Sequence, residues 1–98
     1  MTELARVSCC VPFCRRTFKN PDGHTETLCG KHWRMASPTK RARKSRLGRA
    51  YKRRFGNNGY WAYPPGSEKR IAAAKLDRLC RKAWEACKRQ AIERSAGI

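Results

Sequence analysis

Acidic residues and large aliphatic side chains are both scarce in this 98-residue chain. Asp and Glu number seven against twenty-four Lys and Arg, which leaves a formal net charge of +17 and a pI near 10.6. Ile, Leu and Val together number only ten. So few large aliphatic residues exclude a large hydrophobic core, and a small core usually needs disulfides or a bound metal to hold its fold.

Long apolar segments are also missing. The longest uncharged run, FGNNGYWAYPPGS at 55–67, is too short and too polar to span a bilayer. The first residues, MTELARVSCC, lack the basic stretch followed by an apolar stretch that marks a secretory signal. We therefore expect a cytoplasmic protein without membrane contact. In a reducing cytoplasm the six cysteines are expected to be thiols or metal ligands rather than disulfides.

The positive charge indicates the kind of partner. Self-repulsion at +17 opposes a compact monomer unless a polyanion neutralises it. Nucleic acid is the commonest polyanion for such a protein, ahead of an acidic protein surface or anionic lipid.

The composition divides the chain into four consecutive segments, which we expect to form one compact unit. Residues 1–36 hold four of the six cysteines and both histidines and predict a zinc-binding module. Residues 37–56 predict a basic helix, 57–67 an aromatic loop, and 68–96 a long amphipathic C-terminal helix. The predicted fold class is a small α-rich, zinc-stapled domain in which a short β-hairpin module, similar to a zinc finger, precedes two helices.

Turn and cap residues set the expected element boundaries. Pro21-Asp22-Gly23 predicts a turn between the flanks 15–19 and 25–28, which could pair as a hairpin. Pro38 after Ser37 predicts the start of the basic helix and Gly56 its end. Ser67 predicts the N-cap of the last helix. Its apolar stripe is predicted at Ala72, Leu76, Leu79, Cys80, Ala83, Cys87 and Ala91.

The aromatic loop has two interpretations. Tyr60, Trp61 and Tyr63 are predicted to pack against the two helices, because large apolar residues are otherwise scarce. Stacking on unpaired bases is the alternative.

The cysteines and histidines predict a metal site. Cys9-x4-Cys14 and Cys29-x2-His32 form two ligand pairs with fourteen residues between them. Four ligands of this kind suit tetrahedral zinc, and a site with four protein ligands is structural because no position stays open for water. Spacing alone leaves two alternatives open: Cys10 could replace Cys9 as a ligand, and His24 could replace His32.

Other roles for the thiols fit less well. Cys80 and Cys87 are seven residues apart on a predicted helix, which separates their Cα atoms by about 10 Å, whereas a disulfide needs less than about 7 Å. A catalytic Cys29 paired with His32 would leave the neighbouring cysteines unexplained.

The segment CCVPFCRR…LCGKHWRMA resembles a short zinc-binding module common in bacteriophage genes. That module usually reads Cys-x-Val-Pro-Gly-Cys, then Leu-Cys-x-x-His-Tyr-x-Arg, and it stands alone or precedes homing-type endonuclease domains. The resemblance covers residues 9–36 only, with Phe13 in place of glycine and Trp33 in place of tyrosine. It implies a phage-encoded protein in the host cytoplasm with the zinc ligands Cys9, Cys14, Cys29 and His32.

The basic helix predicts contact with phosphates, because nine cations without an acidic residue between them repel one another until an anion binds. The expected contacts are Lys40, Arg41, Arg43, Lys44, Arg46, Arg49, Lys52, Arg53 and Arg54. We therefore expect a non-enzymatic, zinc-stabilised nucleic-acid-binding protein, with duplex DNA favoured over RNA. The alternative is an inhibitor or adaptor that docks on an acidic host protein. A nuclease is less favoured, because the acidic residues are isolated in the sequence.

Overall fold

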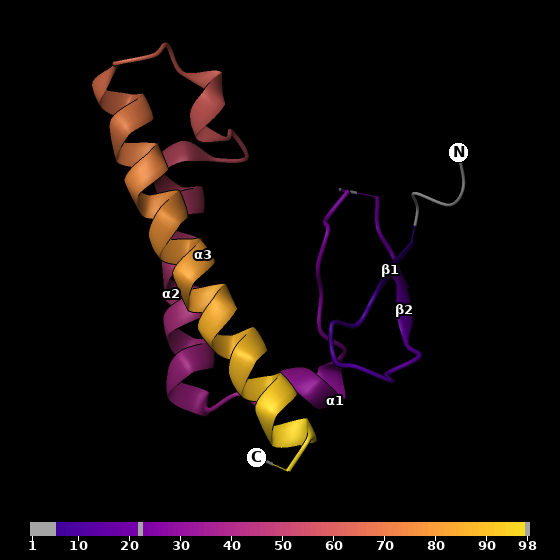
Figure 1. Cartoon of the computed structure of the whole chain (residues 1–98). Coiled ribbons are helices and arrows are strands. Elements are labelled where there is room, and N and C mark those ends of the chain that lie inside the picture. Colours follow the sequence, from indigo (N-terminus) through magenta and orange to yellow (C-terminus); the bar gives the residue numbers. More distant parts are fainter. Residues whose placement is uncertain (1–5, 22, 98) are drawn as a thin grey trace. The chain divides into compact units, whose positions relative to one another are not determined.

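The computed structural model describes residues 6–21 and 23–97. Its elements are β1 (Arg6–Ser8), β2 (Thr17–Lys19), α1 (Gly30–Trp33), α2 (Pro38–Phe55), the 3-10 helix η2 (Tyr60–Ala62) and α3 (Glu68–Ser95) (Figure 1). The two-stranded hairpin and three α-helices confirm a small α-rich fold.

Internal contacts divide the chain into two compact units. The cysteine–histidine unit comprises Met1–Ser37 and Cys87–Ile98, and the two-helix unit comprises Pro38–Ala86. Because α3 spans Glu68–Ser95, it supplies residues to both units.

The hairpin forms from different residues than those predicted. β1 pairs with β2 in antiparallel register, with Val7 opposite Phe18. The predicted partner, 25–28, contributes only an isolated parallel bridge between Thr27 and Cys9. The segment between the two strands contains Cys9, Cys10 and Cys14, and the Cys9 N–H donates to Arg16 O at 3.0 Å across its base. A three-residue strand such as β1 is too short to show alternation in the sequence.

The turn predicted around Gly23 is present and is braced by Asn20. Gly23 has φ 71°, a left-handed conformation that glycine adopts readily, and its N–H donates to Asn20 O at 3.2 Å. The Asn20 side chain accepts from His24 N–H at 2.8 Å and donates to His24 O at 2.6 Å. These bonds satisfy the polar atoms of a buried asparagine, 8% exposed. Asp22 of the predicted turn lies outside the described residues.

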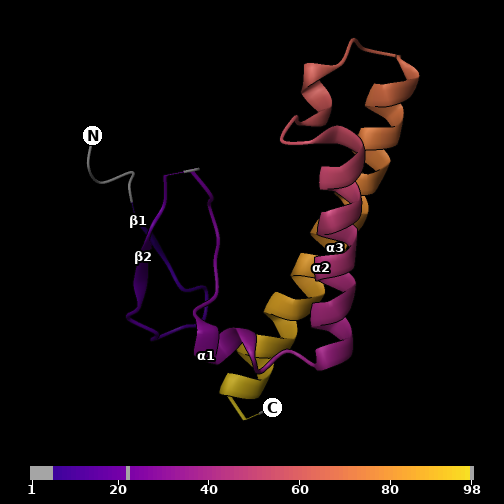
Figure 2. The ribbon, with the colours of Figure 1, turned by 180° about the vertical axis from the view of Figure 1, so that it is seen from behind.

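In the two-helix unit, α2 and the first part of α3 run antiparallel and side by side (Figures 1 and 2). α2 begins at Pro38 as predicted, and Gly56 ends it with φ 65° and an N–H bond to Lys52 O at 2.8 Å. Ser67 caps α3, because its Oγ accepts the Arg70 N–H at 3.2 Å. The sequence therefore located both helix starts correctly.

The core of the two-helix unit is centred on one aromatic residue. Phe55 is 5% exposed, and its ring lies 5.1 Å from the Tyr51 ring and 6.0 Å from the Tyr63 ring, centroid to centroid. Ala73 and Ala83 are buried on α3. Phe55 is therefore the one large side chain that is buried among the described residues of this unit.

One loop aromatic does not pack as predicted. Tyr63 lies against Phe55, and the Arg70 guanidinium lies 5.6 Å from the Tyr60 ring centroid. Trp61, however, is 71% exposed, so the prediction that all three aromatics pack on the helices is wrong for this residue. The Trp61 ring instead lies across the backbone of Gly59, where an added Cβ would come within 2.3 Å of it.

The apolar stripe on α3 is shifted slightly from the predicted one. Ala83, Cys87 and Ala91 are buried as expected, but Leu79 is 41% exposed. Ala73, which lies outside the predicted stripe, is fully buried. At about 100° per residue, Leu79 lies more than a quarter turn from Cys80 and falls at the margin of the stripe.

The last turns of α3 belong to the cysteine–histidine unit. The sequence predicted only that they are helical. Ile92 packs against the core formed by Cys9, Val11 and Cys29. The polar contacts that join α3 to this unit include Ser37 N–H to Gln90 Oε1 (2.5 Å), Arg94 Nη1 to Met35 O (2.9 Å) and Lys88 Nζ to Glu26 Oε2 (2.6 Å).

Candidate metal centre

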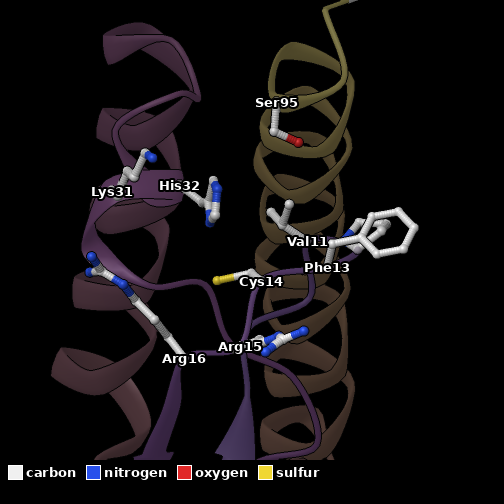
Figure 3. Close-up of a pocket in the computed structure, with 9 residues that line it drawn as sticks. Val11, Phe13, Cys14, Arg15, Arg16, Lys31, His32 and Ser95 are labelled. Atoms are coloured by element: carbon white, nitrogen blue, oxygen red, sulfur yellow. The ribbon is translucent and has the colours of Figure 1, made fainter.

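Four side chains from three parts of the cysteine–histidine unit meet at one point. The thiol sulfurs of Cys9, Cys14 and Cys29 and a ring nitrogen of His32 all lie within 4.8 Å of one another. Cys9 follows β1 and Cys14 precedes β2, so the hairpin turn presents both sulfurs. Cys29 is the N-cap of α1, which places His32 one helical turn later on the same side. Figure 3 shows Cys14 and His32 turned toward one another.

The distances between these atoms fit a four-coordinate ion. His32 Nδ1 lies 3.1 Å from Cys29 Sγ and 3.5 Å from Cys9 Sγ. Tetrahedral zinc, with Zn–S of about 2.3 Å and Zn–N of about 2.0–2.1 Å, would set these atoms about 3.5 to 3.8 Å apart. Because all four ligand atoms lie within 4.8 Å of one another, shifts of up to about 1 Å would complete the tetrahedral geometry. The donor set of three sulfurs and one imidazole suits zinc and excludes the oxygen-seeking cations calcium and magnesium.

The surroundings of the thiols influence their protonation. Burial raises the pKa of Cys9, and the N–H of Cys29, which donates to Cys9 Sγ at 3.4 Å, offsets this only in part. Burial also acts to raise the pKa of Cys29, but hydrogen bonds from the His32 backbone and the Cys9 and Cys14 side chains leave it below its ordinary value. Cys29 is therefore the more readily ionised of the two buried thiols, and thiolate is the form that binds metal.

The structure separates the two alternative ligands from the cluster. Cys10 is half-buried, its N–H donates to Thr27 O at 2.9 Å, and it does not belong to the group of converging ligand atoms. His24 is exposed at the Asn20 turn and is not part of that group either. The six cysteines, all among the described residues, form no disulfide.

Phe13 has a backbone conformation that glycine adopts more readily than other residues. It is the one described non-glycine residue with positive φ, at 70°. That conformation costs an ordinary side chain about 1–2 kcal/mol, whereas glycine adopts it freely. The turn Val-Pro-Phe needs it to bring Cys14 back toward Cys9, and the Cys14 N–H donates to Val11 O at 3.1 Å.

The predicted phosphate-binding residues occupy most of the surface of α2. Arg41 and Lys44 are half-buried, whereas the other seven are exposed: Lys40, Arg43, Arg46, Arg49, Lys52, Arg53 and Arg54. The two-helix unit carries fifteen Lys and Arg against three acidic residues. One of those acids, Asp77, pairs with Arg81 at 3.0 Å on α3. The cations of α2 therefore form a strongly positive surface.

Thiol alkylation distinguishes the six cysteines. In metal-loaded protein we expect Cys10 to react first, because it is half-buried and bound to no metal. Cys80 should react more slowly at pH 8, because burial and Asp77 raise the pKa of its thiol, and its rate should keep rising at higher pH. Cys87 and the three cluster cysteines should react only after chelation or unfolding. Mass spectrometry with iodoacetamide checks this order, and rapid modification of Cys29 in metal-loaded protein would contradict it.

The fold and the site define a small α-rich protein with a three-cysteine, one-histidine cluster able to hold a metal ion. Comparison of the chain with protein-family models, with curated proteins and with solved structures gives no match. No helix among residues 6–21 and 23–97 is long and apolar enough to cross a membrane.

Proposed function

We propose that the chain is a non-enzymatic nucleic-acid-binding protein in which zinc holds the cysteine–histidine unit and α2 contacts the phosphates of duplex DNA. The observation that carries the proposal is the surface of α2, where seven exposed cations share an eighteen-residue helix that has no acidic residue. Their mutual repulsion is relieved when phosphates replace the counterions around them. A helix about 27 Å long at 1.5 Å per residue reaches phosphates on both sides of a DNA groove.

Zinc as the metal is supported by the donor set and by the burial of two of its sulfurs. Cys29 is 1% exposed and Cys9 is 6% exposed. Few other apolar groups are buried in this unit, so the metal would supply stability that the core lacks. The resemblance of residues 9–36 to the phage zinc-binding module also supports zinc and a phage origin.

The metal ligands and the carboxylates both support a non-enzymatic role. With four protein ligands, a zinc ion would keep no position for a reacting water. Two of the acidic residues are held in ion pairs, Asp77 with Arg81 and Glu26 with Lys88. Among the described residues, no carboxylate joins the cluster of converging ligand atoms.

The salt dependence of DNA binding tests the proposal. Arg46, Arg49 and Arg53 lie three and four residues apart on the face of α2 opposite Tyr51 and Phe55. Replacing all three by Gln should make the slope of log K against log[salt] less negative by about 2.7 if each contacts one phosphate. Fluorescence anisotropy with a labelled 20-base-pair duplex measures this slope between 50 and 300 mM salt.

A matched variant controls for net charge. Replacing Lys75, Arg78 and Arg89 of α3 by Gln removes the same three charges from exposed positions outside α2. We expect this variant to keep most of the wild-type slope. Equal slopes for the α2 variant and the wild type would contradict the assignment of α2, and no DNA binding at 50 mM salt would reject the proposed function. A cleaved plasmid after incubation with Mg²⁺ would reject the non-enzymatic role.

A further inference from the structure

Neither burial nor backbone conformation explains why residue 13 is a phenylalanine. Its side chain is 101% exposed, and its backbone has the left-handed φ of 70° that disfavours any residue except glycine. Figure 3 shows the ring pointing away from the Cys14 and His32 side chains. An aromatic ring in open solvent on a strained turn stabilises neither the core nor the turn. A binding partner for the ring is therefore the role that remains.

Three cations surround the open depression that Phe13 lines. Arg15, Arg16 and Lys31 lie along the same depression of about 500 Å³, next to Cys14 and His32 (Figure 3). All three cations are exposed. Within the described part of the chain, none of them forms an ion pair or a side-chain hydrogen bond. The depression has no acidic residue in its lining, so its charge favours an anion.

We propose that this turn surface, defined by Phe13, Arg15, Arg16 and Lys31, binds one unpaired nucleotide of a nucleic acid. The base would stack on Phe13 and the flanking phosphates would contact the three cations. The inference rests on the proposed function, since it assumes that α2 brings the protein to DNA. It goes further by naming the preferred target as DNA with an unpaired base, such as an overhang, a gap or a frayed end.

Size and chemistry both fit this ligand. Sites for small ligands commonly measure about 300–1,000 Å³, and the depression falls within that range. Proteins that bind single strands combine aromatic platforms with positive surfaces, because every base has a stacking face and every nucleotide a phosphate. In an intact duplex the bases stack on one another and leave no free face for the ring. The lining combines Val11 and Pro12 with three cations and no acidic residue, which favours a ligand that has both an apolar face and a negative charge.

The test compares two DNA probes and a variant that removes the ring. Phe13→Gly deletes the aromatic side chain and also suits the positive φ, so the metal centre should remain intact. The probes are a blunt 20-base-pair duplex and the same duplex with a six-nucleotide 3′ overhang carrying 2-aminopurine. Wild-type protein should bind the overhang probe about five-fold to a hundred-fold more tightly than the blunt probe. It should also quench the 2-aminopurine, whereas Phe13→Gly should lose both effects.

Matched variants separate the possible outcomes. Phe13→Trp should keep the preference, and Phe18→Ala, which removes a partly exposed ring on β2 of the same unit, should keep it as well. Equal binding of both probes by wild-type protein, or an unchanged preference in Phe13→Gly, would overturn the inference while blunt-duplex binding still supports α2. Failure to bind either probe would reject the proposed function together with it. An RNA overhang in place of DNA tells which sugar the surface prefers.

Discussion

Replacing Cys29 by Ser is expected to abolish tight zinc binding and to unfold the cysteine–histidine unit. Cys29 is the most buried ligand, 1% exposed, and it also caps α1, which carries His32. Structural zinc contributes about 10–16 kcal/mol in small finger peptides, which is as large as the net stability of about 5–15 kcal/mol of a whole domain. The remaining core of this unit consists of small and half-buried side chains, so it cannot replace the metal.

Metal content and circular dichroism measure this effect together. The wild type should carry one zinc ion per chain, and the variant should carry none after dialysis. Helix signal should fall only in part, because α2 and most of α3 belong to the other unit. Cys10→Ser is the matched control, since it removes a neighbouring thiol outside the cluster and should leave the zinc content unchanged. Full zinc occupancy in Cys29→Ser together with loss in Cys10→Ser would contradict the ligand assignment.

Replacing Phe55 by Ala should unfold the two-helix unit while the other unit keeps its metal. Large-to-small substitutions of buried phenylalanine cost about 3–5 kcal/mol. Phe55 is 5% exposed between Tyr51 and Tyr63, and the other buried residues described in this unit, Ala73 and Ala83, are too small to replace the lost ring. A unit of this size has a small stability to lose. Thermal melts followed at 222 nm, with zinc content measured in parallel, should show a lost transition and unchanged metal.

Two further substitutions, Phe55→Leu and Trp61→Ala, serve as controls for the loss of stability in Phe55→Ala. Phe55→Leu keeps most of the buried volume and should cost clearly less than Phe55→Ala. Trp61→Ala should change the melting temperature little, because the ring is 71% exposed. A Phe55→Ala protein that melts like the wild type would show that the two-helix unit does not depend on this residue.

Features set by neighbours in the sequence were predictable from it. Cys9 and Cys14 are held by one turn, and Cys29 and His32 by one turn of helix, so spacing indicated two ligand pairs but left Cys10 and His24 open as substitutes. Pro38, Gly56 and Ser67 marked helix ends through local backbone geometry. Only the structure distinguishes Cys9 from Cys10 as a ligand. The two residues are adjacent and have nearly the same spacing to Cys14, but their side chains point in different directions.

Features set by distant contacts were not predictable. Val7 pairs with Phe18 across the cysteine turn, and no alternation in three residues reveals such a strand. Ile92 packs on a core formed by Cys9 and Cys29, more than sixty residues earlier, and a helical stripe does not say which partner it meets. The exposure of Trp61 follows from its packing on its own loop at Gly59. In each case a specific contact in the folded chain sets the feature, and the local sequence pattern does not reveal that contact.

X-ray absorption at the zinc edge on the purified, metal-loaded protein tests the central claim most directly. We predict one zinc per chain with three sulfurs at about 2.3 Å and one nitrogen at about 2.0–2.1 Å. That shell corresponds to Cys9, Cys14, Cys29 and His32. A shell of four sulfurs, or a folded protein that carries no metal and is unchanged by a chelator, would contradict it.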